Sequence, residues 1–261
     1  MLVHETALIT GASGGIGEEL ARLFAKDQFD VVLIARSEEK LNALKMELEN
    51  AYGVHAYVLC ANLADPASPQ RIVAKLAAEK IEVTALVNNA GFGAYGFFHQ
   101  TDFLQEKEML QVNVVALSEL TKLLLPGMVL RKKGYILNVA STAAFQPGPL
   151  MAVYYASKAY VLSLSEALAD ELAGTGVQVT CLCPGPTKTG FAAHAKMGKS
   201  RLFTGLAMTA QEVALSGYHG MQAGKRVIIP GWKNTIMAFA TRFVPHSFAA
   251  HLARRMQETK E

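Results

Sequence analysis

The chain has 261 residues, of which 51% are hydrophobic and 18% are charged. This composition excludes a disordered chain and a collagen-like repeat, because neither carries enough apolar residues to build a core. A net charge of +3, with lysine and arginine dispersed, gives no reason to expect a nucleic-acid partner. The longest apolar runs are shorter than a membrane span, and residues 1–10 lead into a strand rather than a signal peptide. We therefore expect a cytoplasmic protein.

Short runs rich in β-branched residues alternate along the chain with longer stretches of helical periodicity. The short runs predict strands at Thr6–Thr10, Val31–Ala35, Val54–Cys60, Val83–Asn88, Tyr135–Ala140, Val177–Cys183 and Val227–Pro230. The longer stretches predict helices at Glu18–Lys26, Glu38–Ala51, Gln70–Glu79, Phe103–Leu125, Tyr155–Ala173 and Ala210–Ala223.

Most of the predicted strands are apolar at nearly every position, so both of their faces should be covered. The alternation of strands and helices then predicts an α/β fold: a doubly wound, seven-stranded parallel sheet with helices on both faces. No linker or repeat interrupts the pattern, so we predict one domain over residues 1–231 and an amphipathic C-terminal extension over residues 232–261.

Three cysteines, Cys60, Cys181 and Cys183, fall in apolar strand-like runs and lack the spacing of metal ligands. We predict that all three are reduced core residues, with Cys181 and Cys183 on opposite faces of one strand, and we predict no metal site.

A glycine-rich turn follows the first predicted strand. Gly11, Gly15 and Gly17, with Ser13 and Ile16 between them, stand where the strand gives way to a helix. Glycines at such a turn allow the backbone to approach a pyrophosphate, and the free amides of the helix start attract anions. The spacing differs from the usual G-x-G-x-x-G, and a packing role for the turn is the alternative.

The end of the second predicted strand bears on cofactor choice. An NAD site would place Asp or Glu there, but the sequence has Ala35 followed by Arg36. A guanidinium can pair with a 2′-phosphate, so NADP(H) is the favoured cofactor, with a solvated strand end as the alternative.

Tyr154 and Lys158 lie one helical turn apart on the same predicted helix face. An ammonium close to a phenol stabilises phenolate and lowers the phenol's pKa from its usual value of about 10. Ser141 closes the fifth predicted strand, from which it could reach the same cleft and hold a substrate carbonyl oxygen. A chance surface pair is the alternative for Tyr154 and Lys158.

The sequence resembles the short-chain dehydrogenase/reductases in their compact single-domain form, over at least Thr6 to Gly231. The resemblance rests on Thr10–Gly17, Asn62-Leu63, Asn88–Gly91, Asn113, Ser141, Tyr154, Lys158 and Pro184–Thr189. It implies a Rossmann-like sheet that binds NAD(P) and a Ser, Tyr, Lys and Asn tetrad that moves a hydride between the nicotinamide and a carbonyl or alcohol.

By this resemblance, Tyr154 is the proton donor or acceptor, and Ser141 holds the substrate oxygen. Lys158 bonds the nicotinamide ribose and lowers the pKa of Tyr154, while Asn113 anchors a water in a proton relay. Tyr155 is a competitor for the role of Tyr154, but its spacing to Lys158 does not match the family.

The resemblance also implies cofactor contacts beyond the glycine turn and Arg36. Asn62, where the family often has Asp, would bond the adenine. The implied set comprises Asn62, Leu63, Asn89, Ala90, Gly91, Tyr154, Lys158, Pro184, Gly185, Thr187 and Thr189.

Aromatic and methionine side chains in three loops predict an apolar substrate pocket. We expect a hydrophobic ketone or secondary alcohol as substrate, with 3-oxoacyl, steroid and lipid-like carbonyls as leading classes. The residues are Phe92, Tyr95, Phe97, Phe98, Phe145, Leu150, Met151, Phe191, Met197, Leu202, Phe203 and Met208.

The segment after Trp232 forms two short amphipathic stretches hinged at Pro245. It could pack on its own domain or on a sister subunit, contact a membrane surface, or fray. The resemblance implies a homodimer or homotetramer formed through Phe103–Leu125 and Tyr155–Ala173. A non-catalytic NADP-binding sensor or scaffold is the alternative function, although such a protein would not need the tetrad.

Overall fold

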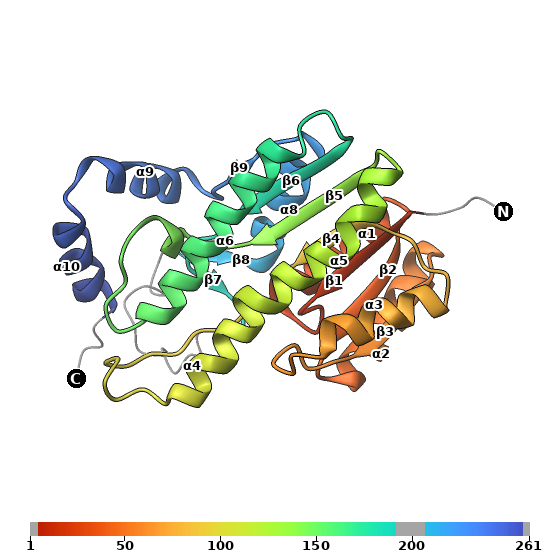
Figure 1. The fold of residues 1–261 in the computed structure, drawn as a ribbon, viewed down its shortest axis with the longest axis horizontal. Helices are drawn as coiled ribbons and strands as arrows, with labels where there is room; N and C mark the ends of the chain where they lie inside the picture. Colours follow the sequence, from red (N-terminus) through yellow and green to blue (C-terminus); the bar gives the residue numbers. More distant parts are fainter. Residues whose placement is uncertain (1–4, 192–206, 258–261) are drawn as a thin grey trace.

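Seven parallel strands form the centre of the computed structural model, which describes residues 5–191 and 207–257 (Figure 1). Their order across the sheet is β3-β2-β1-β4-β5-β6-β9, as a doubly wound fold requires. The strands are β1 (Thr6–Thr10), β2 (Asp30–Ala35), β3 (Ala56–Cys60), β4 (Val83–Asn88), β5 (Gly134–Val139), β6 (Val177–Leu182) and β9 (Val227–Ile228). The predicted fold class is confirmed.

Helices cover both faces of the sheet, which explains why its strands are apolar at successive positions. Within β1, Ala7 and Ile9 pack into one apolar core while Leu8 packs into the other. The helices of the first core are α1 (Gly15–Lys26), α2 (Glu38–Tyr52) and α8 (Ala210–Gln222). The second face carries α3 (Ser68–Ala78), the long helix described next, and α6 (Ala152–Glu171).

The long helix is not regular throughout. It consists of α4 (Phe103–Leu110), a π-helical segment η1 (Gln111–Ala116) and α5 (Leu117–Leu130). By length and composition, residues Phe103–Leu130 could cross a membrane, but Val112, Ala116 and Leu120 pack in the core beside the sheet. The widened π turn lies in the middle of this helix and carries Asn113.

Strand order reverses between β1 and β4, since the chain passes from β1 to β2 and β3 on one side and returns to β4 on the other. Loops at the carboxyl ends of such strands leave a crevice. The segments after β1, β4, β5 and β6 therefore meet at one edge of the sheet. A short parallel pair, β7 (Thr187–Lys188) and β8 (Met208–Thr209), adds a feature that the sequence analysis missed.

The C-terminal extension forms α9 (Trp232–Ala240), a 3-10 turn η4 (Thr241–Phe243) and α10 (His246–Gln257). These helices lie at one side of the molecule, away from the N-terminus (Figure 1). The predicted break at Pro245 is present, because the residue falls between η4 and α10.

The predictions for the cysteines were wrong in two respects. Cys60 is exposed at the end of β3 rather than buried. Cys181 and Cys183 are buried, but their Sγ atoms lie 3.7 Å apart rather than on opposite faces. The reason is that side chains two residues apart on a strand point to the same face, so both thiols enter the same apolar cluster and the prediction misapplied the alternation.

The turn from α6 into β6 contains two glycines with positive φ, Gly174 at +81° and Gly176 at +84°. A Cβ on Gly176 would lie 2.0 Å from the carbonyl oxygen of Lys132, whereas a Cβ on Gly174 would meet nothing within 4 Å. The Gly176 carbonyl accepts a hydrogen bond from the Gly134 amide at 3.3 Å, where β5 begins.

We predict that Gly174→Ala costs about 1–2 kcal/mol, the strain of a left-handed backbone alone. Gly176→Ala should cost about 1–3 kcal/mol more, because the backbone must also move away from Lys132. Urea unfolding of the two variants measures the difference. Equal losses would show that the contact with Lys132 does not set the position of β6.

Candidate active site

The glycine turn after β1 is held open by contacts that leave no room for side chains. Gly11 and Gly15 have φ values of +67° and +60°. A Cβ on Gly17 would lie 2.4 Å from the Gly11 carbonyl oxygen, and a Cβ on Gly15 would lie 3.0 Å from Thr189. Gly14 is the N-cap residue of α1 and makes no side-chain capping hydrogen bond, so the first backbone N–H groups of α1 remain available to an anion.

Thr10, at the end of β1, joins this turn to the end of β4. Its Oγ1 accepts hydrogen bonds from the amides of Asn89 and Ala90, each at 3.0 Å. The Asn89 side chain in turn donates to the carbonyls of Thr10 and Gly11, at 2.9 and 3.2 Å. Asn88 points elsewhere, donating to Thr121 and Asn138 inside the protein. Of the two asparagines, only Asn89 faces the crevice.

The segment after β6 closes the opposite side of the crevice. Thr187 lies in β7 and donates to the Gly185 carbonyl at 2.9 Å, while Thr189 accepts a hydrogen bond from the Phe191 amide at 3.2 Å. The Pro184 carbonyl accepts a hydrogen bond from Ser141 at 3.4 Å. The structure therefore places this segment between the glycine turn and the end of β5.

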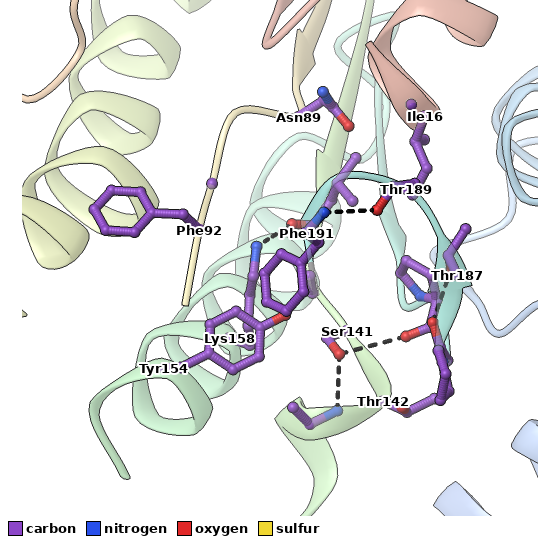
Figure 2. Close-up of a pocket in the computed structure, with 18 of the residues that line it drawn as sticks. Ile16, Asn89, Phe92, Ser141, Thr142, Tyr154, Lys158, Thr187, Thr189 and Phe191 are labelled. Carbon is purple, nitrogen blue, oxygen red and sulfur yellow. Dashed lines mark hydrogen bonds between the residues drawn. The ribbon is translucent and has the colours of Figure 1, made fainter. Parts of the chain in front are cut away.

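Ser141, Tyr154 and Lys158 come together at the carboxyl edge of the sheet (Figure 2). Ser141 precedes a 3-10 turn and accepts a hydrogen bond from the Ala143 amide at 3.1 Å. Tyr154 and Lys158 project from one face of α6, with the Lys158 Nζ atom 5.8 Å from the centre of the Tyr154 ring. The Lys158 ammonium donates to the Val139 carbonyl at 2.8 Å.

Burial shifts the pKa values of Tyr154 and Lys158. Loss of hydration raises the pKa of Tyr154 well above its usual value, and a hydrogen bond with Ser141 offsets only part of the rise. The same loss of hydration lowers the pKa of Lys158 to about 8. In the chain alone the pKa of Tyr154 is therefore raised rather than lowered as predicted, because desolvation outweighs the hydrogen bond with Ser141.

Asn113 lies beneath the site rather than in it. Its side chain bonds both backbone groups of Phe92, accepting from the amide at 3.1 Å and donating to the carbonyl at 3.0 Å. It also donates at 3.1 Å to Ser157, which donates to the Tyr154 carbonyl at 2.7 Å. Asn113 and Ser157 thus fix α6 against the loop after β4. Ser157 was not predicted from the sequence, because its side-chain partner Asn113 is 44 residues away along the chain.

A cavity of about 520 Å³ runs from the glycine turn to Tyr154. Most of the predicted site residues line it: Gly11, Ser13, Gly15, Ile16, Asn89, Ala90, Gly91, Ser141, Tyr154, Lys158, Pro184, Gly185, Thr187 and Thr189. Gly17 and Asn113 instead support the wall from behind.

Besides Gly17, three predicted cofactor residues do not line this cavity. Arg36 and Asn62 are exposed at the ends of the neighbouring strands β2 and β3, while Leu63 is buried in the core. Lys40, from the first turn of α2, does line the cavity and was missed. Lys40 follows Arg36 closely in the sequence, and both residues come after β2, whose carboxyl end faces the crevice. This position could have indicated Lys40 as a site residue.

The cavity is apolar around Tyr154, as predicted. Met151 and Phe191 line it, and the rings of Tyr154 and Phe191 lie 5.3 Å apart (Figure 2). Phe92 borders the cavity, but its ring turns away from Tyr154 (Figure 2). Phe97 and Phe98 are exposed. The predicted contacts Met197, Leu202 and Phe203 lie outside the described residues.

The C-terminal helices supply a wall that the sequence analysis did not assign to the site. Met237 and Ala238 of α9 and Ala253 of α10 line the cavity. Gln257 is fully buried and its Nε2 donates to the Tyr155 hydroxyl at 2.5 Å. Tyr155 is therefore engaged by α10, which separates its role from that of Tyr154. No local pattern indicates this contact between residues 102 positions apart.

Comparisons with known proteins agree with this geometry. A sequence model described as short chain dehydrogenase matches residues 5–199. A very-long-chain 3-oxoacyl-CoA reductase from Anas platyrhynchos is 37% identical over 68% of this chain, but the chain spans only 58% of that reductase. Ketoacyl reductase HetN from Nostoc sp. is 34% identical, with 77% of this chain and 70% of the relative covered.

A solved short-chain dehydrogenase from Sphingobium yanoikuyae, in complex with NADPH, is 32% identical with a TM-score of 0.82. That comparison covers 92% of this chain and 94% of the other. A bulky-bulky ketone specific alcohol dehydrogenase from Comamonas testosteroni is 27% identical with a TM-score of 0.78, over 92% of each chain. On the family match and these relatives, the chain belongs to the short-chain dehydrogenase family.

Proposed function

We propose that this protein is an NADP-dependent oxidoreductase that reduces hydrophobic ketones to secondary alcohols. The observation that carries the proposal is the meeting of Ser141, Tyr154 and Lys158 in the same cavity as the glycine turn. The NADPH complex of the Sphingobium relative and the reductase names of the other relatives support it. No contact in the described site favours a non-catalytic sensor or scaffold.

The residues present fit a dinucleotide. The glycine turn leaves amides of α1 facing the cavity, and a Cβ on Gly91 would lie 3.3 Å from the Lys158 Nζ atom. A side chain there would fill the space beside the lysine. When bound, NADPH supplies a hydride to the carbonyl carbon. Gly11, Gly15 and Thr189 would hold its phosphates and nicotinamide end, and Lys158 its ribose.

The chain's own groups handle the proton. Ser141 donates a hydrogen bond to the substrate oxygen, which orients the carbonyl next to Tyr154. Tyr154 then gives its phenolic proton to that oxygen as the alcohol forms. A raised pKa suits this task, because the phenol keeps its proton until the substrate needs it. Lys158 in its charged form stabilises the phenolate that remains.

Two cations support a preference for NADP(H) over NAD(H). Arg36 follows β2 where an NAD site would place a carboxylate, and Lys40 lines the cavity one turn later. Both can pair with a 2′-phosphate, whereas Ala35 offers no acceptor for a free ribose hydroxyl.

The substrate class follows from the cavity around Tyr154, where Met151, Phe191 and Met237 leave an apolar space. Relatives named for 3-oxoacyl-CoA and bulky ketones support an extended apolar carbonyl compound. We propose in addition a homo-oligomer formed through Phe103–Leu125, which spans α4, η1 and most of α5, and through α6. Exposed Phe103, Leu104 and Tyr160 offer apolar contact area there.

We predict that Tyr154→Phe lowers NADPH-dependent reduction of an apolar ketone by about 10²–10⁴-fold, since it removes the proton donor. The affinity for NADPH should stay within about threefold, because binding rests on the glycine turn. Tyr155→Phe is the matched control and should keep most activity. A panel of 3-oxoacyl thioesters, cyclic ketones and ketose sugars, followed by NADPH consumption, measures both. Preference for sugars would contradict the proposed substrate class.

We predict that kcat/KM for ketone reduction falls as pH rises through about 8, the pKa of buried Lys158. The sign follows because the ammonium is present below this pKa and lost above it, while Tyr154 keeps its proton throughout. Lys158→Arg keeps its charge at higher pH, so its residual activity should extend further upward. If kcat/KM did not change through this pH range, the protonation of Lys158 would not control the reaction.

We predict that Arg36→Asp raises the Kd for NADPH at least about tenfold and changes the Kd for NADH less than about threefold, because only NADPH carries the 2′-phosphate. Quenching of intrinsic fluorescence on titration measures both constants. Lys45→Asp, on α2 but not lining the cavity, is the control. If Arg36→Asp raised the Kd values for NADPH and NADH by the same factor, Arg36 would not contact the 2′-phosphate.

A further inference from the structure

The outer face of the C-terminal helices exposes large apolar side chains. We define it by six residues that are each between 51% and 75% exposed: Trp232, Ile236, Phe239, Phe243, Phe248 and Leu252. Helical spacing places the first four on one side of α9 and η4, and the last two on one side of α10. An exposed set of this size, gathered on adjacent helices, marks an interaction surface rather than scattered exposure.

The opposite face of the same helices is already occupied. Ala238, Ala249 and Ala253 are nearly inaccessible, and Gln257 is fixed to Tyr155. Small residues thus pack on the body of the protein while the large ones face solvent. The segment thus packs on the body of its own chain through this face, and the outer face has no partner within the described chain.

The charge of the C-terminal helices indicates what kind of partner the outer face binds. Residues 232–257 contain four basic residues, Lys233, Arg242, Arg254 and Arg255, and no Asp or Glu. This excess is larger than the net charge of +3 of the whole chain. Lys233 lies over the Trp232 ring at 5.6 Å, and Arg255 is exposed three residues after Leu252 on α10. Arg254 is also exposed, and its guanidinium lies over the Phe97 ring at 5.7 Å. Cations therefore flank the outer face.

We propose that the outer face of α9, η4 and α10 docks on a lipid bilayer that carries anionic headgroups. Apolar side chains on one side of an in-plane helix and Lys or Arg at its edges are what such a surface binds. A second copy of this chain would bring the same positive charge against itself, which disfavours a symmetric contact through this face. An anionic bilayer satisfies the apolar side chains and the cations together.

Docking in this way would place lipid next to the substrate cavity. Lys233, Met237 and Thr241 of the outer helices also line that cavity, as does Ala253. The wall between cavity and bilayer would then be one helix thick, so an apolar ketone could pass from lipid to Tyr154 with little exposure to water. This last step rests on the proposed function, whereas the docking itself does not.

The test is flotation of the full chain with vesicles of phosphatidylcholine, with and without phosphatidylserine. Wild-type protein should float with the anionic vesicles, and less so as salt rises. Phe243→Ser/Phe248→Ser should weaken partitioning at least about tenfold. Arg254→Glu/Arg255→Glu should weaken it by about the same factor on anionic vesicles only. None of these four residues lines the cavity, so turnover of a water-soluble ketone should be unchanged.

Matched controls carry the same changes elsewhere. Met46→Ser/Leu130→Ser alters two exposed apolar residues on α2 and α5, and Lys26→Glu/Lys225→Glu reverses two exposed cations. Both should float like wild type. Absence of flotation, or equal flotation of all variants, would overturn the proposal. So would light scattering that shows a dimer for wild type and a monomer for Phe243→Ser/Phe248→Ser, since the face would then bind a second copy.

Failure of docking and failure of the proposed function give different results. If the protein does not float with vesicles but reduces a soluble ketone, the docking proposal is wrong and the proposed function stands. If it floats but reduces no ketone, the docking proposal stands and the proposed function is wrong.

Discussion

The hydrogen bond between the Lys158 ammonium and the Val139 carbonyl is the contact on which the site depends. Val139 is the last residue of β5, so the bond ties α6 to the sheet at its carboxyl edge. It also holds a cation where little water reaches, which would be unfavourable without a partner. The position of Tyr154, one turn earlier on α6, follows from it.

The same burial acts on the two groups in opposite directions. It disfavours the charged form of each, and therefore raises the pKa of Tyr154 and lowers that of Lys158. A short distance between a phenol and an amine does not by itself give a phenolate, because both groups lose hydration together. In the chain alone this favours a phenol that donates its proton, in agreement with a reductase.

Local sequence was sufficient for much of the fold and of the site. Most of the predicted strand bounds lie within one or two residues of those observed, because burial on both faces makes each strand a continuous apolar run. Gly11, Gly15 and the pair Tyr154 and Lys158 were predictable from short spacings along the chain together with the family resemblance, and the structure brings all four to one cavity. Asn88 and Asn89 show the limit: adjacent and identical, they point to opposite sides, and only the packing around Thr10 distinguishes them.

The C-terminal segment shows why an amphipathic pattern predicts a helix better than it predicts the buried face. The alternation of Phe and Ala residues is satisfied equally well by helices that bury either side. Here α9 and α10 pack on the body of the protein through three small, nearly inaccessible residues, Ala238, Ala249 and Ala253. A phenylalanine at these positions would hold α9 and α10 away from the site and break the contact of Gln257 with Tyr155. The exposed apolar face is thus a consequence of closing the cavity with small residues, and nothing else in residues 5–191 and 207–257 covers it.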